Sequence, residues 1–417
     1  MNKTHYLIVG SSHAALEGLT AIRLHDPDGA LTLVTRDGHL PYSPTVLPYV
    51  VSGKSKPGRI LLRDEAYFED NKAQFVTGAA LVALDSKKAQ ATFDNGETWA
   101  YEKLLLATGA RPAIPPISGL SETPFHVLRT LDDAIGLRRA IGEAKTAIVL
   151  GAGLVGMHGA ENLAKAGVSV SVIEMYDQVL PAYFDAAAAE MIESAFTENG
   201  VRMMLGCTVA STEKDGDQIR VTLKDGESLK ADLLLVATGV QPVIDFLGGS
   251  GVETDRGILV DDTMATSAPN VWAAGDVAQA RDFYRDDKSV VGILPNAVEQ
   301  GRIAGMAMAG DEALKPFPGG VPINTYNFYG RQAISVGLSQ PPEGAEVACD
   351  IDPANGHFRK IVLKDSRLLG ISTVNEPMDA GIMWQLILRR TDLGPVREAF
   401  LANPLETGRA LMSSTWR

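Results

Sequence analysis

The chain has 417 residues, of which 45% are hydrophobic and 21% charged, and its formal net charge is −13. This length exceeds what one hydrophobic core serves, so we expect two or three domains. The acidic balance argues against binding to nucleic acid, and two cysteines, Cys207 and Cys349, are too few for an iron–sulfur or zinc site within this chain.

The start of the chain and its apolar runs bear on location. An apolar strand begins at Tyr6, which leaves no room for a signal peptide. No apolar run approaches the roughly 20 residues that a membrane span needs. We therefore expect a cytoplasmic protein without a membrane span.

The first group of predicted elements is a strand over 6–9, a helix and a second strand over 31–35. This strand–helix–strand order is the unit that holds a dinucleotide. Its turn is a loose fingerprint of three small residues, Gly10, Ser12 and Ala15.

The end of this first unit departs from the fingerprint. The expected acid is missing, since Thr35 stands there with Arg36 behind it. A hairpin is predicted over 89–101, and an apolar strand then ends in Ala107-Thr108-Gly109. That glycine lets the backbone turn against a bound nucleotide.

The second group is a strand over 147–150, a helix through 166 and a strand over 170–174. Its turn carries a complete G-x-G-x-x-G of Gly151, Gly153 and Gly156. These glycines permit the tight turn, the approach of a pyrophosphate and the packing of the helix on the strand.

Glu174 closes the second strand of this group. A carboxylate there accepts hydrogen bonds from a ribose 2′-hydroxyl and repels a 2′-phosphate. No arginine follows it, so the sequence favours NAD(H) over NADP(H).

The predicted elements continue with a helix over 185–198, capped by Asp185, and a hairpin over 218–229. An apolar strand then ends in Ala-Thr238-Gly239, and a helix begins at Leu294-Pro295. Both cysteines lie in apolar stretches, where we expect buried and inert thiols.

The pattern of predicted strands and helices changes after Gly319-Gly320. Four strand-like segments precede two predicted helices, which indicates a separate α+β domain. The strands are expected at 332–336, 345–351, 358–363 and 368–374, and the helices at 380–390 and 394–401.

The segment from Asn270 to Asp276 ends in Ala-Gly-Asp and resembles the FAD/NAD(P)-linked pyridine nucleotide–disulfide reductase superfamily. The resemblance implies an α/β fold with two Rossmann-like dinucleotide-binding domains, the NAD domain inserted in the FAD domain, and a C-terminal α+β interface domain. Its boundaries are 1–115 and 243–320 for FAD, 116–242 for NAD(H) and 321–417 for the interface domain.

The resemblance also implies the cofactor-binding residues, with Asp276 on the ribityl chain and the helix at Leu294 pointing at the flavin. The expected FAD residues are Gly10, Ser12, His13, Ala15, Thr35, Arg36, Pro44, Thr45, Leu81, Ala107, Thr108, Gly109, Gly275, Asp276, Leu294, Pro295 and Ala297. The expected NAD residues are Gly151, Gly153, Leu154, Gly156, Glu174, Thr238 and Gly239.

Within the superfamily, residues 10–13 and 39–44 resemble the NADH oxidase, NADH peroxidase and coenzyme A-disulfide reductase branch. That branch keeps a redox cysteine where this chain has Thr45, and a hydroxyl cannot form a sulfenate or a mixed disulfide. His13 matches the histidine that partners this cysteine. It is either a catalytic acid or base, or a residue that packs near the flavin.

His158 stands where many relatives carry a glutamate after the last fingerprint glycine. It is a second catalytic candidate if it faces the contact between nicotinamide and flavin. The alternative is placement on an ordinary helix surface.

Residues 358–365, 369–371 and 379–387 resemble the FAD subunits of anaerobic multi-subunit oxidoreductases, such as tungsten aldehyde oxidoreductase and phenylglyoxylate dehydrogenase. This likeness implies an iron–sulfur electron-transfer subunit as partner, a tungsten-containing catalytic subunit as a candidate partner, and no metal site in this chain. Two alternatives stay open. One is a free-standing NADH:rubredoxin or ferredoxin reductase or a peroxide-forming NADH oxidase, and the other is a non-catalytic flavoprotein scaffold or redox sensor.

Overall fold

The computed structural model describes residues 1–415. The chain forms two compact units, each built from separate stretches of sequence. The first unit comprises 1–111, 129–131 and 240–320, and the second comprises 112–128, 132–239 and the chain from 321 on. No helix within residues 1–415 combines the length and apolar character needed to cross a bilayer.

A parallel sheet forms the centre of the first unit, in the order β3-β2-β1-β6, with β17 beside β6. Strands β1, β2, β6 and β17 are largely buried, as is usual for parallel strands covered on both faces, whereas β3 at the edge is only half-buried. The elements of this unit are β1 (Asn2–Val9), α1 (His13–His25), β2 (Leu31–Val34), α2 (Leu47–Val51), α3 (Glu65–Asp70), β3 (Ala73–Val76), β4 (Leu81–Asp85), β5 (Gln90–Phe93), β6 (Thr98–Leu106), β16 (Ile258–Leu259), β17 (Val271–Ala273), β18 (Ala278–Arg281), β19 (Lys288–Ser289) and α7 (Leu294–Ala309).

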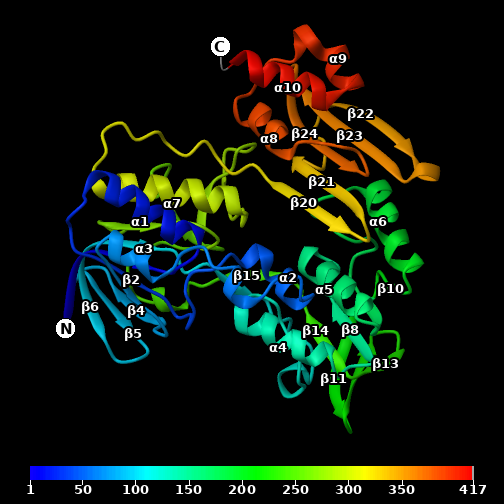
Figure 1. Cartoon of the computed structure of the whole chain (residues 1–417), viewed down its shortest axis with the longest axis horizontal. Coiled ribbons are helices and arrows are strands. Elements are labelled where there is room, and N and C mark those ends of the chain that lie inside the picture. Colours follow the sequence, from blue (N-terminus) through cyan, green and yellow to red (C-terminus); the bar gives the residue numbers. More distant parts are fainter. Residues whose placement is uncertain (416–417) are drawn as a thin grey trace. The chain divides into compact units, whose positions relative to one another are not determined.

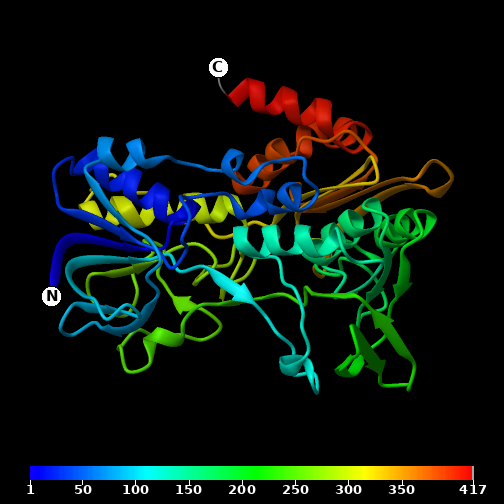
Figure 2. The same cartoon turned by 60° about the horizontal axis from the view of Figure 1, so that its bottom comes forward.

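Helices α1 and α7 lie side by side in the first unit (Figures 1 and 2). A Cβ added at Gly301 would lie 2.2 Å from the carbonyl oxygen of Ala14, and one at Gly305 would lie 2.4 Å from that of Gly18. The two backbones therefore approach to a distance that only glycine permits.

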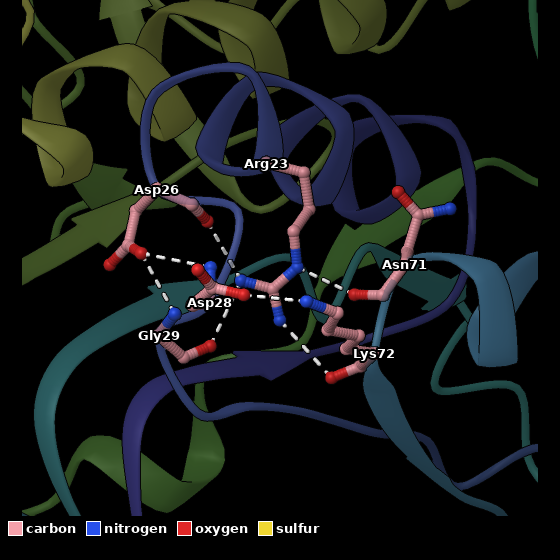
Figure 3. Close-up of polar contacts among 6 residues, drawn as sticks. All are labelled: Arg23, Asp26, Asp28, Gly29, Asn71 and Lys72. Carbon is pink, nitrogen blue, oxygen red and sulfur yellow. Dashed lines mark hydrogen bonds and ion pairs between the residues drawn. The ribbon is translucent and has the colours of Figure 1, made fainter.

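Arg23, near the end of α1, ties this helix to the two loops beside it (Figure 3). Its guanidinium donates to the carbonyl oxygens of Asn71 (2.6 Å) and Gly29 (2.9 Å), and also to those of Asp26 and Lys72. These bonds hold together the chain just before β2 and just before β3, two strands that pair in parallel from Leu31 and Ala73 onward.

A second parallel sheet, in the order β10-β9-β8-β14, forms the first half of the second unit. An antiparallel sheet of β11, β12 and β13 packs with it around one core. The elements are α4 (Leu131–Ile141), β8 (Thr146–Leu150), α5 (Leu154–Lys165), β9 (Ser169–Ile173), α6 (Ala186–Glu198), β10 (Arg202–Met204), β11 (Val209–Asp215), β12 (Gln218–Leu223), β13 (Ser228–Ala231) and β14 (Leu233–Val236). Two short strands, β7 (Ala110–Pro112) and β15 (Val240–Pro242), pair with each other.

The chain from 321 on forms an antiparallel sheet in the order β20-β21-β24-β23-β22, with helices at its end (Figure 1). Helix α8 packs on β21 and β24, and α10 packs on α8 near Gly408. The elements are β20 (Ile323–Phe328), β21 (Arg331–Gly337), β22 (Glu346–Asp352), β23 (His357–Lys364), β24 (Arg367–Val374), α8 (Ala380–Leu388), α9 (Arg397–Ala402) and α10 (Pro404–Thr415).

The predicted fold class, α/β with two Rossmann-like sheets and a C-terminal α+β part, is confirmed. The three-domain boundaries stay a prediction, and the last two residues of the predicted interface domain lie outside the described residues. The predicted helix at 394–401 starts as a 3-10 turn over Gly394–Val396, because Pro395 removes a backbone donor, and continues as α9.

The expectation of two buried cysteines is wrong. Cys349 is exposed, because β22 is an edge strand with most of its side chains in solvent. Cys207 is half-buried and lies in the turn between β10 and β11 rather than in a strand. An apolar stretch at a sheet edge looks like a core strand in sequence but lacks a covering layer.

Candidate functional site

Gly10 forms the turn between β1 and α1 in the first unit. Its φ is +125°, and a Cβ there would lie 2.1 Å from the carbonyl oxygen of Ala107. Its N–H donates to the carbonyl of Val34 at 2.8 Å. The structure thus brings together the predicted residues Gly10 and Ala107, at the carboxyl ends of β1 and β6, where open α/β sheets bind ligands.

The Gly275-Asp276 turn after β17 joins this cluster. The N–H of Gly275 donates to the side chain of Gln300 on α7 at 2.9 Å, and a Cβ on Gly275 would lie 3.1 Å from that of Ala14. A Cβ on Gly292, just before α7, would lie 3.2 Å from Oδ1 of Asp276. The N-terminal ends of α1 and α7 therefore lie beside one turn, and each offers partial positive charge to an anionic ligand.

Arg129 is a residue that the sequence analysis missed. Its guanidinium lies 2.7 Å from Oδ2 of Asp276 and also donates to the carbonyl of Ala110 at 3.1 Å. The arginine and the aspartate are 24% and 20% exposed, so a ligand can still reach the pair. No sequence pattern marked Arg129, because its partner lies 147 positions along the chain.

His13, Ser43 and Thr45 form a hydrogen-bonded chain in the first unit. Nε2 of His13 lies 3.0 Å from the hydroxyl of Ser43, which lies 2.8 Å from the hydroxyl of Thr45. Burial, followed by the charge of Arg63, lowers the pKa of His13 below its usual value. The lowered pKa favours the neutral imidazole, whose Nε2 donates or accepts the hydrogen bond with Ser43 according to its tautomer.

The remaining predicted FAD residues also belong to the first unit. Thr35 is buried, and its hydroxyl accepts hydrogen bonds from Ser11 and from the N–H of Asp37, so its bonds stay inside the protein. Arg36 is exposed and Leu81 is half-buried on β4. The others are Ser12 at the N-cap of α1, buried Ala15, Pro44 in a 3-10 turn, Thr108 and Gly109 after β6, Leu294 and Pro295 at the start of α7, and Ala297 within it.

The glycine turn after β8 is the corresponding feature of the second unit. A Cβ on Gly151 would lie 2.5 Å from the carbonyl oxygen of Ala237, and one on Gly156 would lie 1.9 Å from that of Gly151. Gly153, by contrast, has no atom within 4 Å of its Cβ position. Two glycines thus serve internal packing, whereas Gly153 leaves open space in front of Leu154, the first residue of α5.

Glu174 follows β9 and is 8% exposed. Its carboxylate accepts hydrogen bonds from the N–H of Ala152 in the glycine turn (2.7 Å) and from the N–H of Tyr176 (3.0 Å). A carboxylate has about four acceptor positions, so two remain for a ligand hydroxyl. Thr238 lies at the end of β14, where its hydroxyl donates to the carbonyl of Ala113, and Gly239 follows with φ +116°.

His158 lies on α5 and packs against the C-terminal sheet. Its ring meets Tyr326 of β20 edge-on, with 4.7 Å between the ring centres. Burial lowers its pKa below the usual value. On the same helix, Glu161 accepts a hydrogen bond from the N–H of Tyr329 at 2.8 Å. The structure therefore places His158 between two elements of the second unit rather than on a free helix surface.

Comparisons with known proteins agree on one relationship. The family model described as pyridine nucleotide-disulphide oxidoreductase matches residues 4–301. The chain is 58% identical to the NADH-dependent phenylglyoxylate dehydrogenase subunit epsilon of Aromatoleum evansii, over 99% of this chain and 98% of that protein. It is 27% identical to the rubredoxin-NAD(+) reductase of Pseudomonas putida, over 90% and 97% of the two chains.

A solved structure gives the same result for the fold. The crystal structure of the covalent putidaredoxin reductase–putidaredoxin complex has a chain that superposes with a TM-score of 0.86, at 27% identity and over 99% of both chains.

Proposed function

Because the chain belongs to the pyridine nucleotide-disulphide oxidoreductase family, we propose that it is the NAD-reducing FAD subunit of a multi-subunit oxidoreductase, fed with electrons by an iron–sulfur subunit. The chain is an NAD(H)-dependent oxidoreductase that uses FAD and NAD(H). Membership in this enzyme family argues against the hypothesis that the protein is a non-catalytic flavoprotein scaffold or redox sensor.

The first unit fits a bound FAD. The turn at Gly10 has no room for a side chain, and two helix N-termini and the Asp276–Arg129 pair converge beside it. We assign the pyrophosphate to the N-terminus of α1 and the ribityl chain to Asp276, which Arg129 holds in place. Thr35 is buried and its hydroxyl oxygen accepts hydrogen bonds from Ser11 and from the N–H of Asp37, so we assign it to the turn rather than to the ribose.

The second unit fits NAD(H). Open space at Gly153 leaves the start of α5 free for a pyrophosphate, and the free acceptor positions of Glu174 suit the adenosine ribose. When bound, the two cofactors supply hydride transfer between nicotinamide and flavin. The chain contributes binding, orientation and the exclusion of a 2′-phosphate by the charge of Glu174.

The absence of a redox-active thiol at Thr45 supports the proposal of an external electron donor. The hydroxyl of Thr45 stands where relatives have a redox cysteine, and it bonds to Ser43, which bonds to His13. A hydroxyl holds no redox equivalents. Cys349 lies on the edge strand β22, and Cys207 in a turn of the second unit, so neither replaces it. We therefore infer that the flavin receives electrons from a separate carrier.

The upstream substrate is proposed to be a 2-oxoacid. The relative that is 58% identical is named as a subunit of a phenylglyoxylate dehydrogenase, and phenylglyoxylate is an aromatic 2-oxoacid. That name favours a 2-oxoacid oxidoreductase over an aldehyde oxidoreductase with a tungsten subunit. Oxidation of a 2-oxoacid breaks the bond between its carboxylate and its carbonyl carbon: CO2 leaves, the acyl group passes to a nucleophile such as water or a thiol co-substrate, and one proton and two electrons are released. The two electrons and one proton convert NAD⁺ to NADH.

Purification of the native protein tests this proposal. We expect this chain to co-elute with an iron–sulfur subunit, and the complex to reduce NAD⁺ with phenylglyoxylate. Loss of NAD⁺ reduction but not of dye reduction after removal of this chain would support its position at the end of the electron path. A chain that elutes alone, as a rapid NADH oxidase, would contradict the proposal.

A free-standing reductase is the second candidate. The similarity to a rubredoxin-NAD(+) reductase and to putidaredoxin reductase favours it. It requires that the isolated chain reduce rubredoxin or ferredoxin with NADH as fast as the complex does. Slow turnover by the isolated chain would contradict this second candidate and support the role as a subunit of a larger complex.

A further inference from the structure

Residues 52–61, which we call the basic loop, carry a net positive charge in an otherwise acidic chain. Lys54, Lys56 and Arg59 are exposed, and no acidic residue occurs between Asp37 and Asp64. Within residues 1–415, none of these three cations makes an ion pair. The total charge of −13 includes these three cations, so the rest of the chain carries −16, and an exposed basic loop without ion pairs suits a partner of opposite charge.

The C-terminal end of the loop is bonded to the segment that leads into the candidate flavin residues Pro44 and Thr45. The N–H of Ser43 donates to the carbonyl of Ile60, and the N–H of Leu62 donates to that of Pro41. Tyr42 and Leu61 form a β-bridge between these bonds. Ser43 is the residue that bonds to His13 and Thr45, so the base of the loop is tied directly to that hydrogen-bonded chain.

Apolar side chains complete the surface around these cations. Tyr49, in the middle of α2, is 45% exposed, and Leu61 is 37% exposed. The carbonyl of Tyr49 accepts a hydrogen bond from the N–H of Ser55, which holds α2 and the loop together. An aromatic and an aliphatic side chain beside a charged rim is the composition of a protein–protein contact surface.

We propose that the basic loop, with Tyr49 and Leu61, is the docking surface for an acidic iron–sulfur protein. This inference rests on the proposed function, which requires a separate electron carrier. An iron–sulfur cluster held by four thiolates carries net negative charge, and a carrier that exposes its cluster edge among acidic residues complements the three cations. Docking there brings the carrier to the residues tied to Ser43.

The decisive experiment reverses the charge of the loop. The variant Lys54→Glu/Lys56→Glu/Arg59→Glu is compared with Lys87→Glu/Lys214→Glu/Lys224→Glu, which makes the same change of charge at exposed lysines elsewhere. Both variants and the wild-type holoenzyme are assayed with NADH and a purified acidic [4Fe–4S] ferredoxin over a range of salt concentration. NADH oxidation with an uncharged quinone dye measures the integrity of the cofactor sites.

We expect the loop variant to lose about 10- to 100-fold in kcat/KM for ferredoxin at low salt and to approach the wild type at high salt. The matched variant should lose less than about threefold, and the dye reaction should be equal in all three. Equal loss in both variants, or none in the loop variant, would overturn the docking surface.

Two further outcomes separate the possible failures. If the wild-type holoenzyme shows dye activity but no exchange with any ferredoxin or rubredoxin, the proposed function fails and the docking surface with it. If ferredoxin turnover is unchanged in the loop variant while the wild type alone binds phosphatidylglycerol vesicles, the loop is a membrane-binding surface and the docking proposal is wrong.

Discussion

The turns after β1 and after β8 follow the same backbone course with very different local sequence. Each has a glycine with positive φ packed against the residue that follows another parallel strand, Ala107 in one case and Ala237 in the other. The second turn carries three glycines and Glu174 within one strand–helix–strand unit. The first carries one glycine and gathers its charged residues, Asp276 and Arg129, from distant segments. Equivalent turns can thus be specified locally or by tertiary contacts.

The largest expected effect comes from the shared glycines. Gly10→Ala and Gly151→Ala each place a Cβ within 2.5 Å of a carbonyl carbon or oxygen in a left-handed backbone. Each should lower the free energy of unfolding by about 3 kcal/mol. Gly10→Ala should also abolish FAD retention, whereas Gly151→Ala should retain FAD and lose NADH binding.

Flavin absorbance after purification and NADH titration measure these two losses. The controls are Gly38→Ala in the first unit and Gly136→Ala in the second, because neither glycine has an atom within 4 Å of its Cβ position. Loss of both cofactors in both variants would show that the two turns do not act separately.

The next largest effect distinguishes Glu174, which follows β9, from Thr35, which follows β2. Glu174→Ala should reduce the preference for NADH over NADPH by about 10- to 100-fold, because a charged acceptor is lost from the ribose site. Thr35→Ala should change FAD affinity less than about threefold, since the Thr35 hydroxyl bonds inside the protein. The ratio of kcat/KM for the two nucleotides and FAD titration measure these changes, with Glu190→Ala on α6 as control. Unchanged nucleotide preference would remove Glu174 from the site.

A smaller effect tests the tertiary contact at Asp276. Arg129→Met should weaken FAD binding about tenfold, because Asp276 loses the group that holds it, and Arg129→Lys should recover part of the loss. Titration of the apoprotein with FAD measures both. Arg111→Met breaks the exposed Arg111–Asp245 pair in the same unit and should have little effect. Equal weakening by Arg111→Met would mean that general destabilisation, not Asp276, explains the result.

The smallest effect concerns the thiols. Cys207→Ser combined with Cys349→Ser should leave NADH-to-dye activity within about twofold of the wild type, because neither sulfur carries electrons in the proposed path. Steady-state rates at equal FAD content are the measurement. Loss of activity in a folded variant that retains its FAD would show that a protein thiol takes part in the reaction.

The sequence predicts what repeats locally and misses what depends on tertiary contacts. Buried strands, the glycine turns and the cap at Asp185 were predictable because each depends on neighbouring residues, and the structure confirms these elements. Arg129 was not, since its meaning comes from Asp276 after folding. Exposure of Cys349 also depends on a layer that β22 lacks. The packing of His158 on Tyr326 likewise requires the C-terminal sheet.

The glycine contact between α1 and α7 has a consequence for synthesis on the ribosome. These helices belong to the two ends of the first unit, so its sheet must wait for β17 and α7 before the contact between Ala14 and Gly301 can form. The parallel sheet of the second unit, by contrast, uses an unbroken stretch from β8 to β14. Domains generally fold as units while the chain emerges. The parallel sheet of the second unit is therefore complete while the strands β1 and β2 of the first unit still lack β17. It folds before the first unit can be completed.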